Sequence, residues 1–319
     1  MRAVRLEQYG DPSGLVPADV PAPTPTAGQI LIRTAAIGVG GVDAVMRRGT
    51  LVRVAPEGIV PGSEVAGVVE QVGDGVDPGW VGRRVWATPG LLGGYAEQVT
   101  AHLDDVTELP DDLSFVDAAA LGSAATVAHF ALEHARFAPG ERVLVRGAAG
   151  SIGISAVELA ARRGAAAVAV TTSSAQRGER LRALGATHVL DRNGAGDDDA
   201  SYDVVVDIVG GPDQARFIDR LAPNGRLVLV GGVAGFPPDD FGAALIRSFQ
   251  QSRSFATFSL NTIAVDRRNA ARADLLRAAA RGDLTPVVHD VLPLDRAADA
   301  HRQMDDGAVL GRIVLVPEG

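Results

Sequence analysis

A glycine-rich segment between Val143 and Gly153 leaves few folds open to this chain. It reads Val-Leu-Val-Arg-Gly-Ala-Ala-Gly-Ser-Ile-Gly, a short apolar run followed by a tight turn. The turn matches the six-residue dinucleotide fingerprint, with Ala148 in place of its first glycine. Gly150 would let the backbone approach a pyrophosphate, and Gly153 would let the next helix pack closely on the strand. We therefore expect cofactor contacts from Ala149, Gly150, Ser151, Ile152 and Gly153; the alternative is a glycine-rich turn without a ligand.

The rest of the chain indicates two kinds of domain, as a length of 319 residues also suggests. From Ser114 onward, predicted strands alternate with predicted helices. The strands are at 142–146, 167–171, 188–190, 204–209 and 226–230, and the helices are at 115–135, 151–163, 175–184 and 214–221. This alternation predicts an α/β fold with a doubly wound parallel sheet. Residues 1–115 are β-rich instead, and after about Ser254 two helices, at 267–281 and 295–304, precede a terminal strand at 312–316.

The residues after the second predicted strand favour NADPH over NADH. An NAD site needs an acidic residue there to accept hydrogen bonds from the ribose, but 170–177 contains no carboxylate. Thr172, Ser173 and Arg177 are suited to a 2′-phosphate, because arginine gives paired, charge-assisted hydrogen bonds. Arg192, after the third strand, is a further candidate. The alternatives are helix capping for Ser173 or Ser174 and a solvated loop charge for Arg192.

Composition excludes several classes of protein. The formal net charge of −9 disfavours nucleic acid and anionic membrane surfaces as partners. The chain has no cysteine, so it has no disulfide and no thiolate metal site. It has no lysine either, so a phosphate that is held by a long cationic side chain must be held by arginine. No uninterrupted apolar stretch reaches the ~18 residues of a membrane span, and the first residues lack the apolar core of a signal peptide. We expect a cytoplasmic protein.

Several further segments, taken in order, carry a family resemblance over nearly the whole chain. They are 61–73, 82–86, 94–97, 109–111, the fingerprint, 184–191, 202–207 and 310–315. With these segments the chain resembles the zinc-free quinone oxidoreductases of the medium-chain dehydrogenase/reductase superfamily. The resemblance implies a Rossmann NADPH-binding domain at 116–255, inserted in a discontinuous GroES-like catalytic domain at 1–115 and 256–319. It also implies NADPH as cofactor and a homodimer.

The resemblance assigns further cofactor-binding residues. It implies that Thr126 lies near the nicotinamide, that the loop Gly231, Gly232, Val233 passes beneath the cofactor, and that Phe258, Ser259, Leu260 contact it from the far side. Val209 and Arg312 are assigned to the cofactor site as well. The cofactor would lie in a cleft between the two domains, with its nicotinamide facing an apolar pocket.

The predicted substrate region departs from the family. Ser63 stands where zinc-dependent relatives have a histidine ligand, and without cysteine no metal site is expected. Gly40 and Val45 replace the usual asparagine and a frequent tyrosine, so no dedicated proton donor is evident. His129, three residues after Thr126, is a weak catalytic candidate; a packed helix histidine is the alternative. The predicted substrate pocket comprises Val42, Val45, Met46 and Arg48.

Two charged features near this pocket have ordinary interpretations. Asp43 is expected to cap a helix rather than to act as a base. Arg47, Arg48 and Arg53 form a basic group that would suit an anionic thioester, although a solvated face is the interpretation we favour.

A reductase that transfers hydride from NADPH to a quinone or another conjugated carbonyl fits these features, because such acceptors stabilise the incoming electrons without a Lewis acid. The alternatives are an enoyl-thioester reductase of the polyketide type and a non-enzymatic NADPH-binding protein. An RNA-binding role is disfavoured by the net charge.

Overall fold

The computed structural model describes residues 1–50, 58–196 and 200–317 and divides into two compact units. Unit 1 comprises Met1–Ser123 and Ala264–Gly319, and unit 2 comprises Ala124–Ile263. The first division falls inside the helix α2 (Phe115–His134). The domain limits expected from the sequence, at 115 and 255, stay a prediction.

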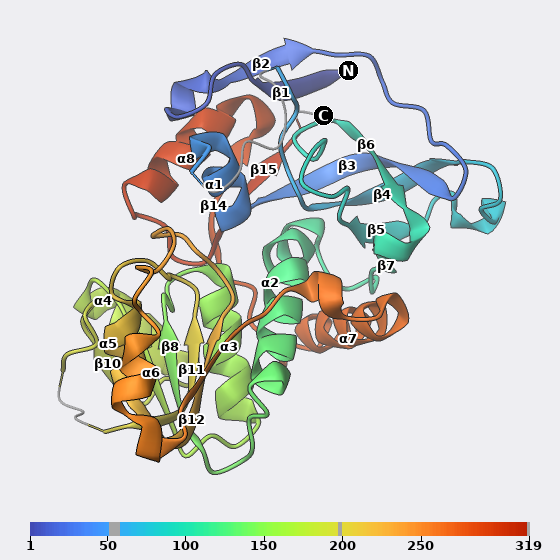
Figure 1. The fold of residues 1–319 in the computed structure, drawn as a ribbon. Coiled ribbons are helices and arrows are strands. Elements are labelled where there is room, and N and C mark those ends of the chain that lie inside the picture. Colours follow the sequence, from blue (N-terminus) through green and yellow to red (C-terminus); the bar gives the residue numbers. More distant parts are fainter. Residues whose placement is uncertain (51–57, 197–199, 318–319) are drawn as a thin grey trace. The chain divides into compact units, whose positions relative to one another are not determined.

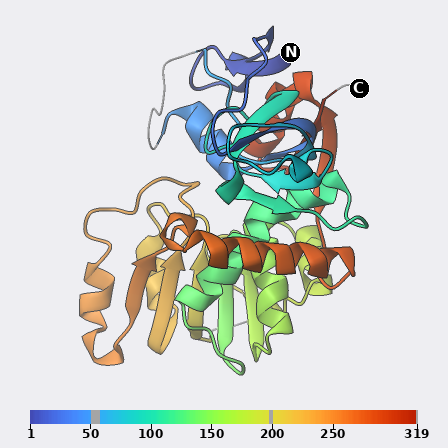
Figure 2. The same cartoon turned by 90° about the vertical axis from the view of Figure 1, so that its right-hand side faces the viewer.

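A six-stranded parallel sheet forms the centre of unit 2 (Figures 1 and 2). Its order is β10-β9-β8-β11-β12-β13, which is the Rossmann strand order 3-2-1-4-5-6. The strands are β8 (Arg142–Arg146), β9 (Ala167–Thr171), β10 (His188–Leu190), β11 (Tyr202–Asp207), β12 (Leu221–Leu229) and β13 (Ser254–Thr257). The order reverses between β8 and β11, so the predicted doubly wound sheet is confirmed.

Helices form the connections between these strands. They are α3 (Ser151–Arg162), α4 (Ala175–Ala183), α5 (Gln214–Asp219) and α6 (Ala243–Arg247). Since right-handed crossovers lead away from β8 and β11 in opposite directions, they place helices on both faces of the sheet. The predicted helix at 214–221 is too long, because Leu221 already pairs with Tyr202 at the start of β12. Buried apolar side chains including Leu144, Val205, Phe217 and Leu227 form the core between helix and sheet.

Unit 1 is built on a mostly antiparallel sheet. The strand order is β14-β15-β3-β4-β5-β7, with β6 also paired to β3. The strands are β3 (Gln29–Val39), β4 (Val65–Val72), β5 (Arg84–Ala87), β6 (Gln98–His102), β7 (Val106–Glu108), β14 (Val288–Pro293) and β15 (Arg312–Val316), with a separate hairpin of β1 (Arg2–Leu6) and β2 (Leu15–Asp19). Because β15 pairs with β3, the C-terminal segment returns to the first unit as expected.

Unit 1 also contains the helices α1 (Gly41–Arg48), α7 (Val265–Ala280) and α8 (Ala297–Asp305). Its short 3-10 turns are η1 (Pro12–Gly14), η2 (Pro78–Trp80), η3 (Leu103–Asp105) and η6 (Leu294–Arg296), whereas η4 (Phe249–Gln251) and η5 (Leu260–Thr262) belong to unit 2. By length and composition, one helix within the described ranges, α2, is apolar enough to cross a membrane. In its most apolar window 67% of the residues are buried, as in the core helix of a soluble protein.

Candidate functional site

The fingerprint turn joins β8 to α3 with the backbone geometry that a dinucleotide needs. Gly147 has a φ of +85°, and a Cβ on Gly153 would lie 2.5 Å from Gly147 O, so both positions require glycine. Gly150 is the N-cap of α3 and makes no side-chain capping bond. A Cβ added there would meet only Gly147 O, at 3.9 Å. The N-terminus of α3 is thus open to a ligand, and its amides fit a pyrophosphate.

Two threonines at the end of β9 adjoin this turn. Thr171 Oγ1 accepts a hydrogen bond of 3.1 Å from Gly147 N and so holds the turn in place. Thr172 Oγ1 is buried and, among the described residues, has no hydrogen-bond partner. A buried hydroxyl without a partner is costly, which fits a site completed by a polar ligand. Thr172 was predicted; Thr171 was missed, although a polar residue ending an apolar strand was the signal.

The two residues proposed for a 2′-phosphate are brought together. Arg177 Nη1 donates to Ser173 Oγ over 3.1 Å. Ser174 caps α4 by accepting from Arg177 N at 3.3 Å, so capping falls on the second serine. Arg192 is exposed in the turn after β10. Because Leu190 O accepts from Thr172 N over 3.1 Å, Arg192 follows the same sheet edge as Ser173.

The loops after β11, β12 and β13 lie at the carboxyl edge of the sheet, where ligands bind in doubly wound folds. Ala234 N donates to Val209 O over 2.9 Å, which joins the first two loops. A Cβ on Gly231 would lie 2.6 Å from Ile208 O, so these loops approach closely there. Phe258 begins the third loop, and its amide donates to Leu229 O over 3.0 Å. The structure therefore places Val209, Gly231, Gly232, Val233, Phe258, Ser259 and Leu260 at one edge.

Thr126 and His129 lie on α2 and are packed. The side chain of Thr126 is fully buried. His129 Nδ1 accepts from Arg163 Nη2 at 2.5 Å, which fixes the neutral tautomer of its imidazole. Its ring also packs edge-on against Phe130. These contacts fit the packed-histidine alternative, and a catalytic role for His129 stays a prediction.

In unit 1, α1 carries the four residues predicted for the substrate pocket. Asp43 caps this helix as expected: its Oδ2 accepts from Gly40 N over 2.7 Å, and its Oδ1 accepts from Ser63 Oγ over 3.1 Å. Val42 is 45% exposed and Val45 is partly exposed, whereas Met46 is 3% exposed and lies on the buried side of α1. The structure groups Val42 with Val45 and places Met46 elsewhere.

The expectation of a solvated basic face is wrong for Arg47. Its side chain is 1% exposed, and Nη2 donates to both oxygens of Asp305 at 2.6 and 2.8 Å. Arg48, predicted for the substrate pocket, pairs with the same carboxylate. The apparent basic group was misread because its partner lies more than 250 residues away in the sequence. Arg53 lies outside the described residues.

A buried histidine, His301, also contacts Arg47 and helps to hold α1 in place. Arg47 Nε donates to His301 Nδ1 over 3.1 Å, so the ring's proton is on Nε2, which contacts Tyr95 Oη at 2.9 Å. Burial and the neighbouring Arg47 charge lower the pKa of His301 to about 3. Burial raises the pKa of Asp43 to about 6 and the pKa of Tyr95 well above its usual value. Folding thus shifts the pKa values of three groups in the surroundings of α1.

His301 should make the protein sensitive to acid. The unfolded chain protonates this histidine near pH 6.5, but the folded chain does so only near pH 3, so its contribution to stability is present above pH 6.5 and lost as pH falls. At pH 5 this difference amounts to about 2 kcal/mol. Asp43 acts in the opposite direction, because its raised pKa favours the folded state below pH 3.8 and loses that effect as pH rises through 6.

Between pH 6.5 and pH 5, the Tm of the variant His301→Gln should therefore fall less than the Tm of the wild type. Glutamine can still accept from Arg47 and donate to Tyr95, but it does not titrate. Thermal melts across this range would measure the effect, with the exposed residue His102, changed to Gln, as control. Parallel pH profiles for His301→Gln and the wild type would contradict the prediction.

Arg312 lies in a second buried cluster of unit 1. Its Nη2 donates to Glu64 Oε2, while Glu64 Oε1 accepts from Trp86 Nε1 at 2.6 Å and from Ser123 N at 2.8 Å. The side chain of Arg312 is 7% exposed. Its predicted contact with the cofactor stays a prediction, and its observed role is to neutralise Glu64.

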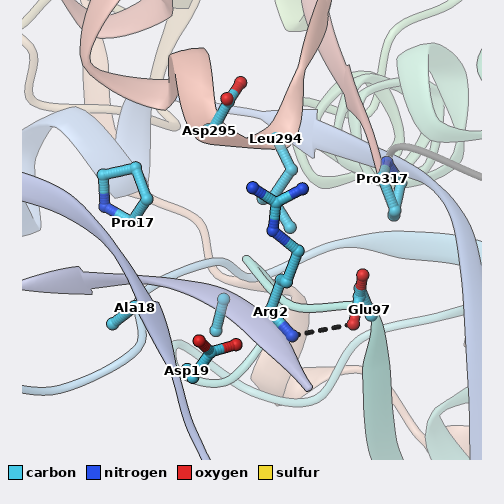
Figure 3. Close-up of a pocket in the computed structure, with 9 residues that line it drawn as sticks. Arg2, Pro17, Ala18, Asp19, Glu97, Leu294, Asp295 and Pro317 are labelled. Atoms are coloured by element: carbon cyan, nitrogen blue, oxygen red, sulfur yellow. Dashed lines mark hydrogen bonds between the residues drawn. The ribbon is translucent and has the colours of Figure 1, made fainter.

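A cavity of about 210 Å³ lies elsewhere in unit 1 (Figure 3). It is lined by Arg2, Ala3, Pro17, Ala18, Asp19, Glu97, Leu294, Asp295 and Pro317. Arg2 N donates to Glu97 Oε2 over 2.7 Å at its wall, and the Arg2 side chain extends toward Leu294. None of the predicted site residues lines this cavity.

Comparisons with known proteins identify relatives over nearly the whole chain. Residues 26–111 match the alcohol dehydrogenase GroES-like domain family, and residues 184–315 match a zinc-binding dehydrogenase family. Mouse quinone oxidoreductase is 30% identical over 99% of this chain and 98% of its own length. The human synaptic vesicle membrane protein VAT-1 homolog is 31% identical over 94% of this chain and 81% of its own. A mycobacterial protein solved in complex with NADPH is 29% identical, with a TM-score of 0.90 over 99% of this chain and 100% of its own.

Proposed function

The chain belongs to the quinone oxidoreductase branch of the medium-chain dehydrogenase/reductase superfamily, and we propose that it reduces a quinone or another conjugated carbonyl with NADPH, without a metal ion. The observation that carries this proposal is the open N-terminus of α3 at Gly150, in a chain with full-length similarity to a quinone oxidoreductase. When bound, NADPH supplies the hydride, so the protein has to bind, orient and shield the cofactor.

Each part of the cofactor has residues suited to it. The amides at the start of α3 hold the pyrophosphate, and Thr171 keeps the turn before them in place. Ser173 and Arg177 hold the 2′-phosphate through a hydroxyl and a guanidinium. The loops at Val209 and Gly231 support the nicotinamide end at the carboxyl edge of the sheet.

Metal independence rests on the ligands that the chain offers. The sequence has no cysteine, so the thiolate ligands of the zinc-dependent relatives are missing. The hydroxyl of Ser63 donates a hydrogen bond to Asp43 Oδ1. Without a Lewis acid, acceptors that delocalise the added electrons over a conjugated system are favoured over simple ketones.

The ion pairs that Arg47 and Arg48 form with Asp305 favour quinones over enoyl thioesters as substrates. Arg47 is buried in its ion pair with Asp305 and cannot reach an anionic thioester carrier, and Arg48 is drawn to the same carboxylate. A quinone needs no such charge, and its reduced oxygens can take protons from water. A polyketide-type enoyl reductase and a non-enzymatic NADPH-binding protein remain the alternative functions.

Initial rates of cofactor oxidation with a naphthoquinone would test the proposal, with NADPH and NADH run side by side. We expect turnover with NADPH and much slower turnover with NADH. Faster turnover with an enoyl-coenzyme A would move the substrate to thioesters. NADPH binding without turnover on either acceptor would support the non-enzymatic function and overturn ours.

We also propose that the protein is a cytoplasmic homodimer. β13 is the edge strand of its sheet, and the preceding segment exposes Phe236, Ile246 and Phe249 at 73%, 72% and 80%. An open sheet edge beside exposed apolar side chains favours pairing with a second copy. Sedimentation at the mass of two chains would support the dimer, and sedimentation at the mass of one chain would overturn it.

A further inference from the structure

The two central strands of the unit 2 sheet end in opposite charges. Arg146 is the last residue of β8, Asp207 is the last residue of β11, and the two are paired in register. Their side chains form a buried ion pair, with 3.0 Å between Nη1 and Oδ2 and exposures of 5% and 0%. This is the place where the strand order reverses, and in doubly wound sheets ligands bind beside that point.

Asp207 is held by more than its ion pair. Oδ1 accepts from Val209 N at 2.8 Å and from Gly210 N at 3.0 Å, and Oδ2 also accepts from Gln214 Nε2 at 3.0 Å. One carboxylate thus fixes the first turn after β11 to the start of α5. Arg146 is also held in place, because its guanidinium stacks 4.0 Å above the buried ring of Phe217.

The turn that Asp207 holds is connected to the other cofactor loops. Ala234 N donates to Val209 O, and Gly211 N donates to Gly235 O over 3.0 Å, so the loop after β12 is bound to the loop after β11. On the other side, a Cβ on Gly147 would come within 2.9 Å of Val209 Cγ2, so the fingerprint turn packs directly against Val209. Three segments predicted to touch the cofactor therefore meet around one ion pair.

We propose that Arg146 and Asp207 are positioning residues for the dinucleotide, in that their ion pair locks the loops at Val209 and Gly231 against the fingerprint turn. This inference rests on the proposed NADPH site, because it assigns a function to the support beneath that site. Neither residue touches the cofactor. Arg146 acts by holding Asp207, and Asp207 acts by holding the backbone amides of Val209 and Gly210.

A second ion pair of the same sheet separates this function from simple stability. Arg226 at the amino edge pairs with Glu141, with 2.8 Å between Nη1 and Oε1 and exposures of 18% and 23%. Arg226 also donates to Ala135 O, so it joins β12 to the end of α2. Loss of either pair should destabilise the fold, but only the Arg146 pair lies at the carboxyl edge.

The test compares Arg146→Met with Arg226→Met in the full chain. Hydrogen exchange of the cofactor-free protein would report the protection of residues 208–211 and 231–235, and fluorescence titration would give the Kd for NADPH. We expect Arg146→Met to lower protection in both loops and to raise the Kd about 10- to 100-fold, since small misplacements of a site are costly. Arg226→Met should lower Tm and leave loop protection and Kd near wild type.

Arg146→Lys covers the case in which Arg146→Met does not fold, because it keeps the positive charge but loses the planar group stacked on Phe217. We expect an intermediate rise in Kd and partial loss of protection. Wild-type values for this variant, or an Arg146→Met protein with lowered Tm but unchanged Kd and loops, would overturn the proposal. A wild-type chain that does not bind NADPH would refute the proposed function instead, while the loop protection would still test the ion pair.

Discussion

Replacing Gly150 by valine should lower the affinity for NADPH at least about 100-fold, which corresponds to about 2.7 kcal/mol of binding free energy. Gly150 has φ −80° and ψ 160°, values that valine readily adopts. The new Cβ would meet nothing closer than Gly147 O at 3.9 Å. Its methyl groups would therefore occupy the space from which a pyrophosphate reaches the amides of α3, while the added Cβ itself makes only an ordinary contact.

The control for this variant is Gly242→Val. Gly242 is also a helix N-cap of unit 2, with a φ of −65° and no atom within 4 Å of an added Cβ. Both variants should melt close to the wild type, and only Gly150→Val should fail to bind NADPH in a fluorescence titration. Retained affinity in Gly150→Val would refute the placement of the pyrophosphate. Gly153→Val is less informative, because its Cβ would lie 2.6 Å from Ala148 Cα and would disturb the fold itself.

Sequence patterns predicted the nucleotide half of the fold because its signals are local. The apolar runs that become β8, β9 and β11 are continuous, as expected for strands buried on both faces. The glycines of the fingerprint turn are required by sterics within a few residues of one another. Residues 243–247 and 254–257, which form α6 and β13, were missed, since both elements are short and α6 exposes an apolar residue, Ile246.

The surroundings of charged residues could not be predicted in the same way. Arg47 resembles a solvated helix cation until Asp305 and His301 from α8 are placed beside it. Arg146 is a charged residue at the end of an apolar strand, and its partner Asp207, which meets it in register, lies 61 residues later. Such partners are set by strand order and helix packing, and these depend on the whole fold rather than on local periodicity.

The preference for NADPH should depend on Arg177. Its guanidinium and the Ser173 hydroxyl lie within 3.1 Å of each other just beyond β9, and the segment from Val170 to Arg177 contains no carboxylate. Hydrogen bonds from a cation to a phosphate contribute about 1.5–3 kcal/mol, so Arg177→Ala should raise the KM for NADPH about 10- to 100-fold. The KM for NADH should hardly change, because NADH has no 2′-phosphate.

Arg180→Ala provides the matched control, since Arg180 is an exposed cation one turn further along α4. Its loss lowers the local positive charge equally but removes no group beside Ser173. If Arg177→Ala and Arg180→Ala raised the KM for NADPH alike, general attraction of an anion would explain the preference. If Arg177→Ala weakened NADH and NADPH equally, Arg177 would support the site without contacting the 2′-phosphate. Only a loss confined to NADPH and to Arg177 identifies that side chain as the group that distinguishes the two cofactors.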